Sequence, residues 1–231
     1  MNAVGSNSDN IINYDLETSS KRNISYYFYI FFKRVFDLVF SFFAILFMIP
    51  LIIIIKIIYI LNGDFEPVIF SQLRIGKNGK LFKFYKFRSM IPNADEYLKE
   101  YLKKNKEAAM EYKINKKLKN DPRVTKVGKF LRDNSIDELP QMINIFKGDM
   151  SLIGNRPYLP REKEDIGKYY KDIVKTKPGL SGLWQVSGRS NLTFKDRLKL
   201  ESYYSNNANL WLDIKIFFKT FLVVLKKNGA R

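Results

Sequence analysis

The 231-residue chain contains no histidine and no cysteine. The absence of cysteine excludes disulfides and thiolate metal sites, and it is compatible with a reducing compartment. Without these two residue types, a nucleophile or general base has to be a carboxylate, a hydroxyl or an amine. Acidic residues are also scarce, because 23 Asp and Glu stand against 40 Lys and Arg. The net charge of +17 indicates an anionic partner: nucleic acid, lipid head groups or phosphorylated substrates.

Charge is missing altogether from Leu38–Ile55, which reads LVFSFFAILFMIPLIIII. A straight helix over this run would measure about 27 Å, close to the roughly 30 Å of a bilayer core. One transmembrane helix is therefore one interpretation. Two features favour a re-entrant hairpin instead: basic residues flank both ends, and Pro50 cannot donate the hydrogen bond to the carbonyl of Leu46. A membrane break at Pro50 would let the chain enter and leave on one face.

Two strands are expected after the apolar run, Val68–Leu73 and Leu81–Met90, with a hairpin turn at Asn78-Gly79 between them. Alternation along the second strand places Lys86 and Arg88 on one face. A half-buried strand with solvated lysines explains this pattern, and so does a phosphate-binding site. Helices are expected further along the chain: Asn93–Leu118, Pro160–Lys171, Phe194–Tyr204 and Trp211–Leu225, the last lying against the membrane or the core.

The block Ser135–Pro157, SIDELPQMINIFKGDMSLIGNRP, carries the adjacent acids Asp137 and Glu138. Two acids amid so much positive charge suggest a site for anions and a metal. Ser135-x-x-Glu138 is also a capping-box pattern, so a helix start alone would explain both acids. The two interpretations are compatible, since the first turn of a helix presents free N–H groups to phosphate.

Two further segments have alternative interpretations. Pro178–Arg189, PGLSGLWQVSGR, contains glycines that allow backbone to approach a ligand, but a tight turn packing Trp184 would also explain it. The stretch KLFKFYKFR, Lys80–Arg88, interleaves aromatic and cationic residues as single-strand nucleic-acid binders do. A nucleic-acid-binding module explains neither the apolar run nor the acids.

The chain resembles the bacterial sugar transferases, also called monotopic phosphoglycosyl transferases, over roughly Lys33–Leu225. Several independent blocks carry the resemblance in the right order: KRVFD (Lys33–Asp37), the Pro-interrupted apolar run, KFRSM (Lys86–Met90), DPRVTKVGKFLR (Asp121–Arg132), SIDELPQMINIFKGDMSLIG (Ser135–Gly154), NRP (Asn155–Pro157), PGLSGLWQVSGR and WLDIKIFFKT (Trp211–Thr220). The chain is similar to the short form, without the extra membrane helices of longer members. Departures include Ile49, where Ser is frequent, and Asn155, where Pro is frequent.

The resemblance implies transfer of a sugar-1-phosphate from a UDP-sugar to polyprenyl (undecaprenyl) phosphate, the first membrane step of surface glycan assembly. It implies that Asp137 is the nucleophile, that a covalent phosphosugar intermediate forms on it, and that Glu138 assists. Mg²⁺ is the implied cofactor. A carboxylate approaching a diphosphate meets a repulsion of roughly 4 kcal/mol for unit charges 4 Å apart at an effective dielectric near 20. A metal and arginines would offset this repulsion.

The candidate residues follow from this chemistry. Those expected to bind substrate phosphate are Lys86, Arg88, Arg123, Arg132, Arg156, Gln185 and Arg189. Those expected to hold the metal are Asp137, Glu138 and Asp149.

The expected fold class is α/β, mostly helical with a small sheet. It comprises a mobile N-terminal lead (1–25), a membrane-associated re-entrant helix (26–61) and a compact cytoplasmic catalytic domain with interfacial amphipathic helices (62–231). The expected location is the cytoplasmic face of the bacterial inner membrane. The expected partners are the UDP-sugar, polyprenyl phosphate and membrane lipids, with no nucleic acid. The sugar, the glycan pathway and the choice between monomer and homodimer stay open, and a membrane-anchored scaffold or inactive homologue is the alternative function.

Overall fold

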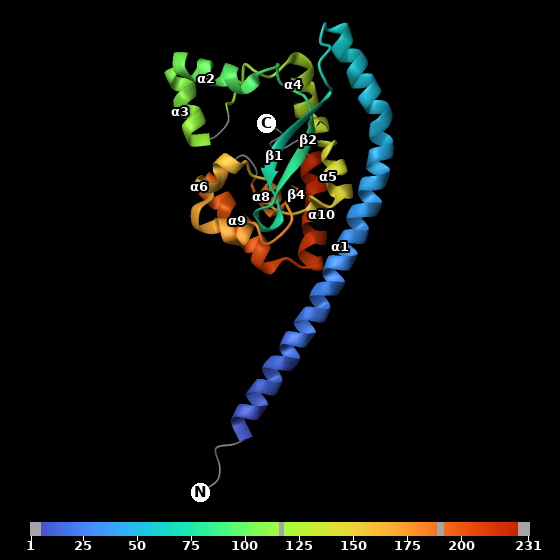
Figure 1. Ribbon diagram of the computed structural model, residues 1–231, viewed down its shortest axis with the longest axis vertical. Helices are drawn as coiled ribbons and strands as arrows, with labels where there is room; N and C mark the ends of the chain where they lie inside the picture. The colour runs from blue at the N-terminus through green and yellow to red at the C-terminus, as the bar shows by residue number, and fades with distance from the viewer. Residues whose placement is uncertain (1–5, 116–117, 189–191, 226–231) are drawn as a thin grey trace.

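The computed structural model describes residues 6–115, 118–188 and 192–225. One long helix, α1 (Ser6–Leu61), runs along one side of a compact body formed by the rest of the chain (Figure 1). Its C-terminal half lies against this body, whereas its N-terminal half extends beyond it (Figure 1). The structure is mostly helical with two small sheets, which confirms the expected α/β class in its coarse form.

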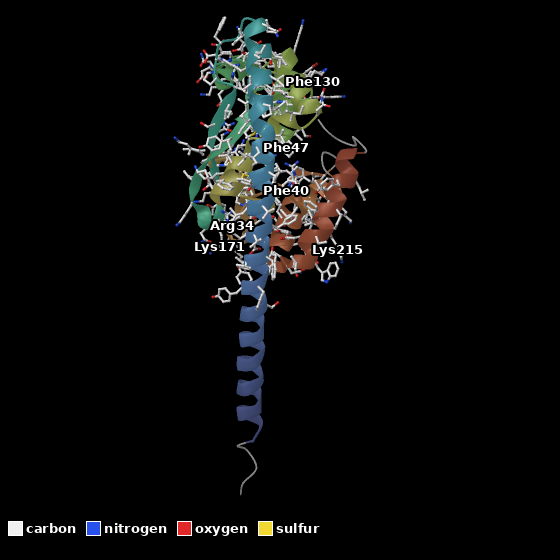
Figure 2. All side chains as sticks on the ribbon, turned by 90° about the vertical axis from the view of Figure 1, so that its right-hand side faces the viewer. Arg34, Phe40, Phe47, Phe130, Lys171 and Lys215 are labelled. Carbon is white, nitrogen blue, oxygen red and sulfur yellow. The ribbon has the colours of Figure 1, made fainter. Side chains whose placement is uncertain are left out.

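The two faces of α1 differ in what they contact. Its buried residues recur at spacings of four, seven or eight, which places them on one side of the helix: Tyr29, Asp37, Ser41, Met48, Ile55 and Tyr59. The other side exposes large apolar side chains, among them Phe28 at 60% and Leu46 at 48%. Figure 2 looks onto this side, where Phe40 and Phe47 project from α1. Within the described chain, α1 is the one helix apolar and long enough to cross a membrane, from Ser25 to Leu61.

The predicted break at Pro50 is wrong, because α1 continues through this residue without reversing direction (Figure 1). Pro50 itself is exposed. Met48 and Ile55 on either side of it are buried in one cluster with Phe87 and Leu131 of the body. These contacts pack the helix against the same body on both sides of Pro50. Their stabilisation offsets the roughly 3 kcal/mol that an interior proline costs. The helix also begins at Ser6, so it takes in most of the segment expected to be a mobile lead.

The predicted hairpin is confirmed. Strands β1 (Ile69–Ile75) and β2 (Leu81–Phe87) pair antiparallel, with Gln72 opposite Phe84. A 3-10 turn, η1 (Lys77–Gly79), joins them, and Asn78 takes the left-handed conformation that asparagine tolerates.

The helix predicted over Asn93–Leu118 is divided in two. Helices α2 (Ala94–Lys104) and α3 (Lys106–Asn115) meet at Asn105, whose extended backbone ends the first and whose side chain accepts from Ala108 N in the second. They form a small outlying cluster with Leu98 and Leu118 at its centre.

The rest of the body consists of short helices, 3-10 turns and a second pair of strands. The helices and 3-10 turns are α4 (Lys126–Asp133), η2 (Ile136–Glu138), α5 (Gln141–Lys147), η3 (Pro160–Glu162), α6 (Lys163–Ile166), η4 (Gly167–Tyr169), α7 (Tyr170–Ile173), α8 (Leu183–Ser187), α9 (Phe194–Asn207) and α10 (Leu210–Leu225). Strands β3 (Ser151–Ile153) and β4 (Gly179–Ser181) pair in parallel. The helices predicted near the C-terminus are confirmed as α9 and α10, whereas the charged helix predicted over Pro160–Lys171 is broken into short turns.

Candidate active site

The adjacent acids lie on a 3-10 turn between α4 and α5, not in the first turn of an α-helix. Ser135 precedes them in the left-handed conformation (φ +57°), and its side chain makes no capping hydrogen bond. The capping-box interpretation is therefore wrong. Pro140 stands at the N-cap of α5, which begins at Gln141, because a proline is tolerated at the start of a helix but not in its interior. Asp137 and Glu138 therefore lie before α5, and both face β2.

Lys86 of β2 joins the two acids. Its Nζ lies 3.3 Å from Asp137 Oδ2 and 2.9 Å from Glu138 Oε1. Asp137 is 6% exposed, and Lys86 is its only hydrogen-bond or ion-pair partner among the described residues. Burial raises the pKa of Asp137 and the charge of Glu138 adds to this, while Lys86 and Arg132 act in the opposite direction. The carboxylate is therefore poorly solvated and depends on nearby cations for its charge.

Arg132 reaches this site because α4 packs tightly against the chain after β2. Thr125 begins α4, its Oγ1 accepting from Gly128 N at 2.9 Å. A Cβ at Gly128 would stand 2.0 Å from Ser89 O, so only glycine permits this approach. One turn later, Arg132 Nε donates to Ser89 Oγ at 2.8 Å. Burial lowers the pKa of Arg132, whereas the charges of Asp137 and Asp121 favour its protonated form.

A cleft of about 410 Å³, including its open mouth, adjoins the dyad. Lys86 and Glu138 line it from the acidic side. The other lining side chains include two arginines, an indole and an amide: Arg74, Arg156, Trp184 and Gln185. Chemically, the arrangement pairs a buried carboxylate with a cleft rich in guanidinium groups, which suits a reaction at a phosphate.

Comparison with known proteins agrees with this chemistry. The family model described as "Bacterial sugar transferase" matches residues 28–227 of this chain. The chain belongs to the bacterial sugar transferase family. The resemblance recognised in the sequence is thereby confirmed.

Several family members share much of this sequence. The chain is 46% identical over 203 residues to the undecaprenyl-phosphate galactose phosphotransferase of Salmonella typhimurium, covering 87% of the chain and 42% of that protein. It is 39% identical over 198 residues to the exopolysaccharide production protein ExoY of Rhizobium meliloti, covering 86% and 87%. It is 35% identical over 199 residues to the UDP-glucose:undecaprenyl-phosphate glucose-1-phosphate transferase of Klebsiella pneumoniae, covering 82% and 39%. The chain thus spans about two fifths of the Salmonella and Klebsiella proteins.

Around Asp137 the structure brings together three of the predicted site residues of this bacterial sugar transferase, Lys86, Arg132 and Glu138. Two more, Arg156 and Gln185, line the adjoining cleft. Lys86 lies beside the dyad, and its expected contact with a substrate phosphate stays a prediction. Gln185 Nε2 donates a hydrogen bond to Leu180 O at 3.1 Å. This bond does not use the amide oxygen of Gln185. Arg189 lies outside the described residues.

Two predicted phosphate ligands lie elsewhere. Arg88 follows the end of β2 and contacts the end of α1: its Nη2 is 2.7 Å from Asp64 Oδ1, and its guanidinium lies over the ring of Tyr59. Arg123 is bound by Asp121, with Nη2 2.6 Å from Oδ2. Neither guanidinium is bonded to Asp137, and neither lines the cleft. The alternation that placed Arg88 beside Lys86 fails because the strand ends at Phe87.

The predicted metal shell is not assembled as a group of three acids. Asp149 lies past the C-terminus of α5, where Asn144 Nδ2 is 3.5 Å from its Oδ2. No cluster of three or more His, Cys, Asp or Glu side chains occurs within the described ranges. Asp137 and Glu138 alone still fit Mg²⁺, since this ion commonly uses one or two carboxylates together with substrate phosphates and water.

The glycine-rich segment forms strand β4 and helix α8 rather than an open loop. A Cβ at Gly179 would stand 2.1 Å from Gly154 N, so these glycines allow two backbone segments of this protein to approach each other. Gly179 and Leu180 nevertheless form part of the cleft lining. In the aromatic-basic stretch, Phe84 and Phe87 are buried, which leaves them unable to stack on bases and argues against the nucleic-acid interpretation.

Sequence reasoning missed Arg74 as a cleft residue. No local signal would have distinguished it, because the cleft is formed by segments from β1, β2, η2, β4 and α8 that are distant in sequence.

Proposed function

We propose that this protein transfers a sugar-1-phosphate from a UDP-sugar to polyprenyl phosphate at the cytoplasmic face of the bacterial inner membrane. The observation that carries the proposal is the buried carboxylate of Asp137, held by one lysine beside an arginine-lined cleft. The names of the relatives support the substrate classes, because they include undecaprenyl-phosphate and UDP-sugar phosphotransferases. The products would be polyprenyl-diphosphate-sugar and UMP.

The first step is attack by a carboxylate oxygen of Asp137 on the sugar-linked phosphorus. The bond from this phosphorus to the bridging oxygen breaks, and UMP leaves with that oxygen and the electron pair. Asp137 then carries the phosphosugar as an acyl phosphate. In the second step an oxygen of the polyprenyl phosphate attacks the same phosphorus, and the Asp137 carboxylate leaves unchanged.

The surrounding cations have separable roles in these steps. Lys86 keeps Asp137 ionised against the effect of burial, so the nucleophile needs no general base. Arg132 and Arg156 would stabilise negative charge on the phosphoryl oxygens, since guanidinium groups suit phosphate geometry. Glu138 would orient Lys86 and share in holding a cation.

Mg²⁺ fits the donor set of Asp137 and Glu138, and when bound it would neutralise charge on the diphosphate. Chelation with EDTA should therefore stop turnover, and adding Mg²⁺ back should restore it. Turnover that persists after exhaustive chelation would remove the metal from the proposal.

One-sided membrane attachment is supported by the packing of α1. Its buried residues extend from Tyr29 to Tyr59, about 46 Å of helix at about 1.5 Å per residue, against a bilayer core of roughly 30 Å. Crossing the bilayer would draw the polar body into hydrocarbon. We therefore infer that α1 lies in the plane of the membrane, with Phe28 and Leu46 toward lipid. Helix α10, which exposes Trp211 and Phe218, would lie at the same surface.

The native lack of cysteine makes this topology directly testable. Single cysteines introduced by Ser6→Cys and Gly229→Cys should both react with a membrane-impermeant maleimide only from the cytoplasmic side. Reaction from opposite sides would establish a true span.

The reaction is tested by trapping the intermediate. Purified protein in lipid nanodiscs is incubated with UDP-galactose, UDP-glucose or UDP-N-acetylgalactosamine labelled at the sugar-linked phosphorus. The correct donor should label wild-type protein and Glu138→Gln but not Asp137→Asn, and polyprenyl phosphate should remove the label. Turnover without any protein label would overturn the covalent route, and neither label nor turnover with any UDP-sugar would favour the scaffold alternative.

A further inference from the structure

Three buried N–H groups near the cleft lack hydrogen-bond acceptors. They are Arg74 Nε, Trp184 Nε1 and Arg197 Nε, and within the described ranges they are the only buried side-chain nitrogen or oxygen atoms without a partner. Buried donors in folded proteins nearly always have an acceptor, so an orphaned group calls for an explanation. Three orphaned donors in one region indicate that a bound ligand supplies the acceptors.

These donors belong to one structural unit. The guanidinium of Arg197, from α9, lies over the ring of Trp184 at 4.3 Å from its centroid. Trp184 and Arg74 both line the cleft. Arg74 is oriented by its other nitrogens, since Nη1 donates to Pro157 O at 3.1 Å and Nη2 to Gln72 Oε1 at 3.0 Å. Its Nε has no acceptor at all among the described residues.

The same unit holds positive charge that carboxylates do not neutralise. Among the described residues, no acidic oxygen lies within ion-pair distance of the guanidinium groups of Arg74, Arg156 or Arg197. Glu201 is close, but its oxygens accept from Arg156 N at 3.0 Å and from the hydroxyl of Tyr158 at 2.8 Å.

The electrostatics agree with this geometry. Burial and the neighbouring Arg156 lower the pKa of Arg74 to about 10, and the same two causes lower the pKa of Arg197. Clustered cations repel one another, and a bound oxyanion would offset that repulsion.

We propose that Arg74, Trp184 and Arg197 form the subsite for the phosphate of the leaving nucleotide, the one released as UMP. This inference rests on the proposed function. In-line displacement places the leaving oxygen on the side of the phosphorus away from Asp137, so cations are needed in the cleft beyond the dyad. The subsite residues come from β1, α8 and α9. The exposed apolar side chains inferred to face lipid belong to α1 and α10, so the phosphate of the lipid acceptor is the less suitable occupant.

The subsite is tested by comparing a nucleotide with its phosphate-free nucleoside. Trp184→Phe keeps an aromatic ring beneath Arg197 and removes the N–H together with the rest of the five-membered ring. Arg197→Lys keeps the charge and removes the planar fork. For wild-type protein in nanodiscs, calorimetric titration should show UMP binding more tightly than uridine. Each variant should bind UMP about tenfold more weakly, with uridine affinity unchanged. Arg161→Met is the matched control: it removes an exposed charge near Arg74 but outside the cleft, and should change UMP affinity less than twofold.

The outcomes separate this inference from the proposed function. UMP affinity that is unchanged in both Trp184→Phe and Arg197→Lys, or reduced in parallel with that of uridine, would overturn the subsite while leaving the transferase proposal standing. Pyrophosphate provides the second probe. If wild-type protein binds pyrophosphate but neither UMP nor UDP-sugars, the proposed donor is wrong, and the loss of pyrophosphate binding in the variants still decides the subsite. Failure of wild-type protein to bind UMP and pyrophosphate alike would overturn both. Thermal melts of each variant should match the wild type, and Arg74→Gln replaces any variant that does not fold.

Discussion

Asp213 and Asp137 are buried to almost the same extent, at 7% and 6% exposed, but their surroundings differ. Asp213 joins α10 to α1: it accepts from the hydroxyls of Tyr29 and Tyr204 at 2.9 and 2.7 Å, and its Oδ2 lies 2.5 Å from Lys33 Nζ. Asp137 has only Lys86 among the described residues, at 3.3 Å.

The comparison shows how burial alone fails to distinguish an anchor from a reactive group. A carboxylate whose oxygens are all bonded fixes two elements together and has little left to offer a substrate. Asp37 is a second anchor of α1, because its Oδ1 accepts from Leu152 N at 2.8 Å and from Ser151 Oγ at 3.1 Å. Asp137 keeps lone pairs without partners beside the cleft, which is what a nucleophile requires.

The largest effect is expected from Asp137→Asn, which keeps the shape of the side chain but replaces one oxygen by an amide nitrogen and removes the negative charge that makes it nucleophilic. Sugar-phosphate transfer should fall by about a thousandfold or more, while the melting temperature stays the same or rises because a buried charge is lost. Steady-state release of UMP and a thermal melt measure the two quantities. Transfer within tenfold of the wild type would contradict the role of Asp137.

Asp213→Ala should instead lower the stability of the fold. It leaves Lys33 buried without its carboxylate, and removal of one partner of a buried pair typically costs about 3–5 kcal/mol of stability. Chemical denaturation in detergent micelles followed by circular dichroism measures the loss. The double variant Lys33→Met/Asp213→Leu removes both charges and should recover much of it. A single variant as stable as the wild type would show that this pair does not anchor α1.

Glu201 is an intermediate case, a fully buried acid with two hydrogen bonds and no ion pair. Burial raises its pKa to about 7 from an ordinary value of 4.5. The folded state therefore binds a proton more tightly than the unfolded state. The stability from this group is complete below about pH 4.5 and is lost as pH rises to about 7, a total of about 3 kcal/mol.

Glu201→Gln removes the titrating proton and tests this slope. The free energy of unfolding, measured from pH 4.5 to 7.5, should decline less steeply in Glu201→Gln than in the wild type. Identical slopes would show that Glu201 is ionised in the folded protein throughout this range.

The smallest effect is a shift in pH dependence on replacing Lys86 by Gln. The lysine charge lowers the pKa of Asp137, so its removal should raise that pKa and move the acid limb of kcat/KM to higher pH. Lys86→Arg keeps the charge and should leave the limb near its wild-type position. An acid limb that stays in place in Lys86→Gln would show that Lys86 does not set the ionisation of Asp137.

Local patterns in the sequence predicted much of the site. The adjacent acids and the strand that carries Lys86 were both found from short segments, because adjacency and alternation are local properties. Arg88 and Asp149 were misplaced for one common reason. Each lies just past the end of an element, where the periodicity that would orient it no longer applies.

The error at Pro50 has a different origin. The basic flanks and the lost backbone hydrogen bond that predicted a break are features of the local sequence, whereas Met48 and Ile55 on either side of Pro50 pack on the same body. The arginine and indole groups of the cleft were beyond prediction for a related reason, since Arg74, Trp184 and Arg197 come from three elements separated by many residues.

The sequence by itself determined the chemical resources of this protein: no thiol or imidazole, a strong positive charge, one long apolar segment and a pair of adjacent acids. Those follow from composition and from neighbours along the chain. The tertiary structure alone decided which acids became anchors and which was left under-bonded, because a carboxylate's partners come from distant segments. Asp213 meets α1 and is satisfied, whereas Asp137 meets one lysine and a cleft.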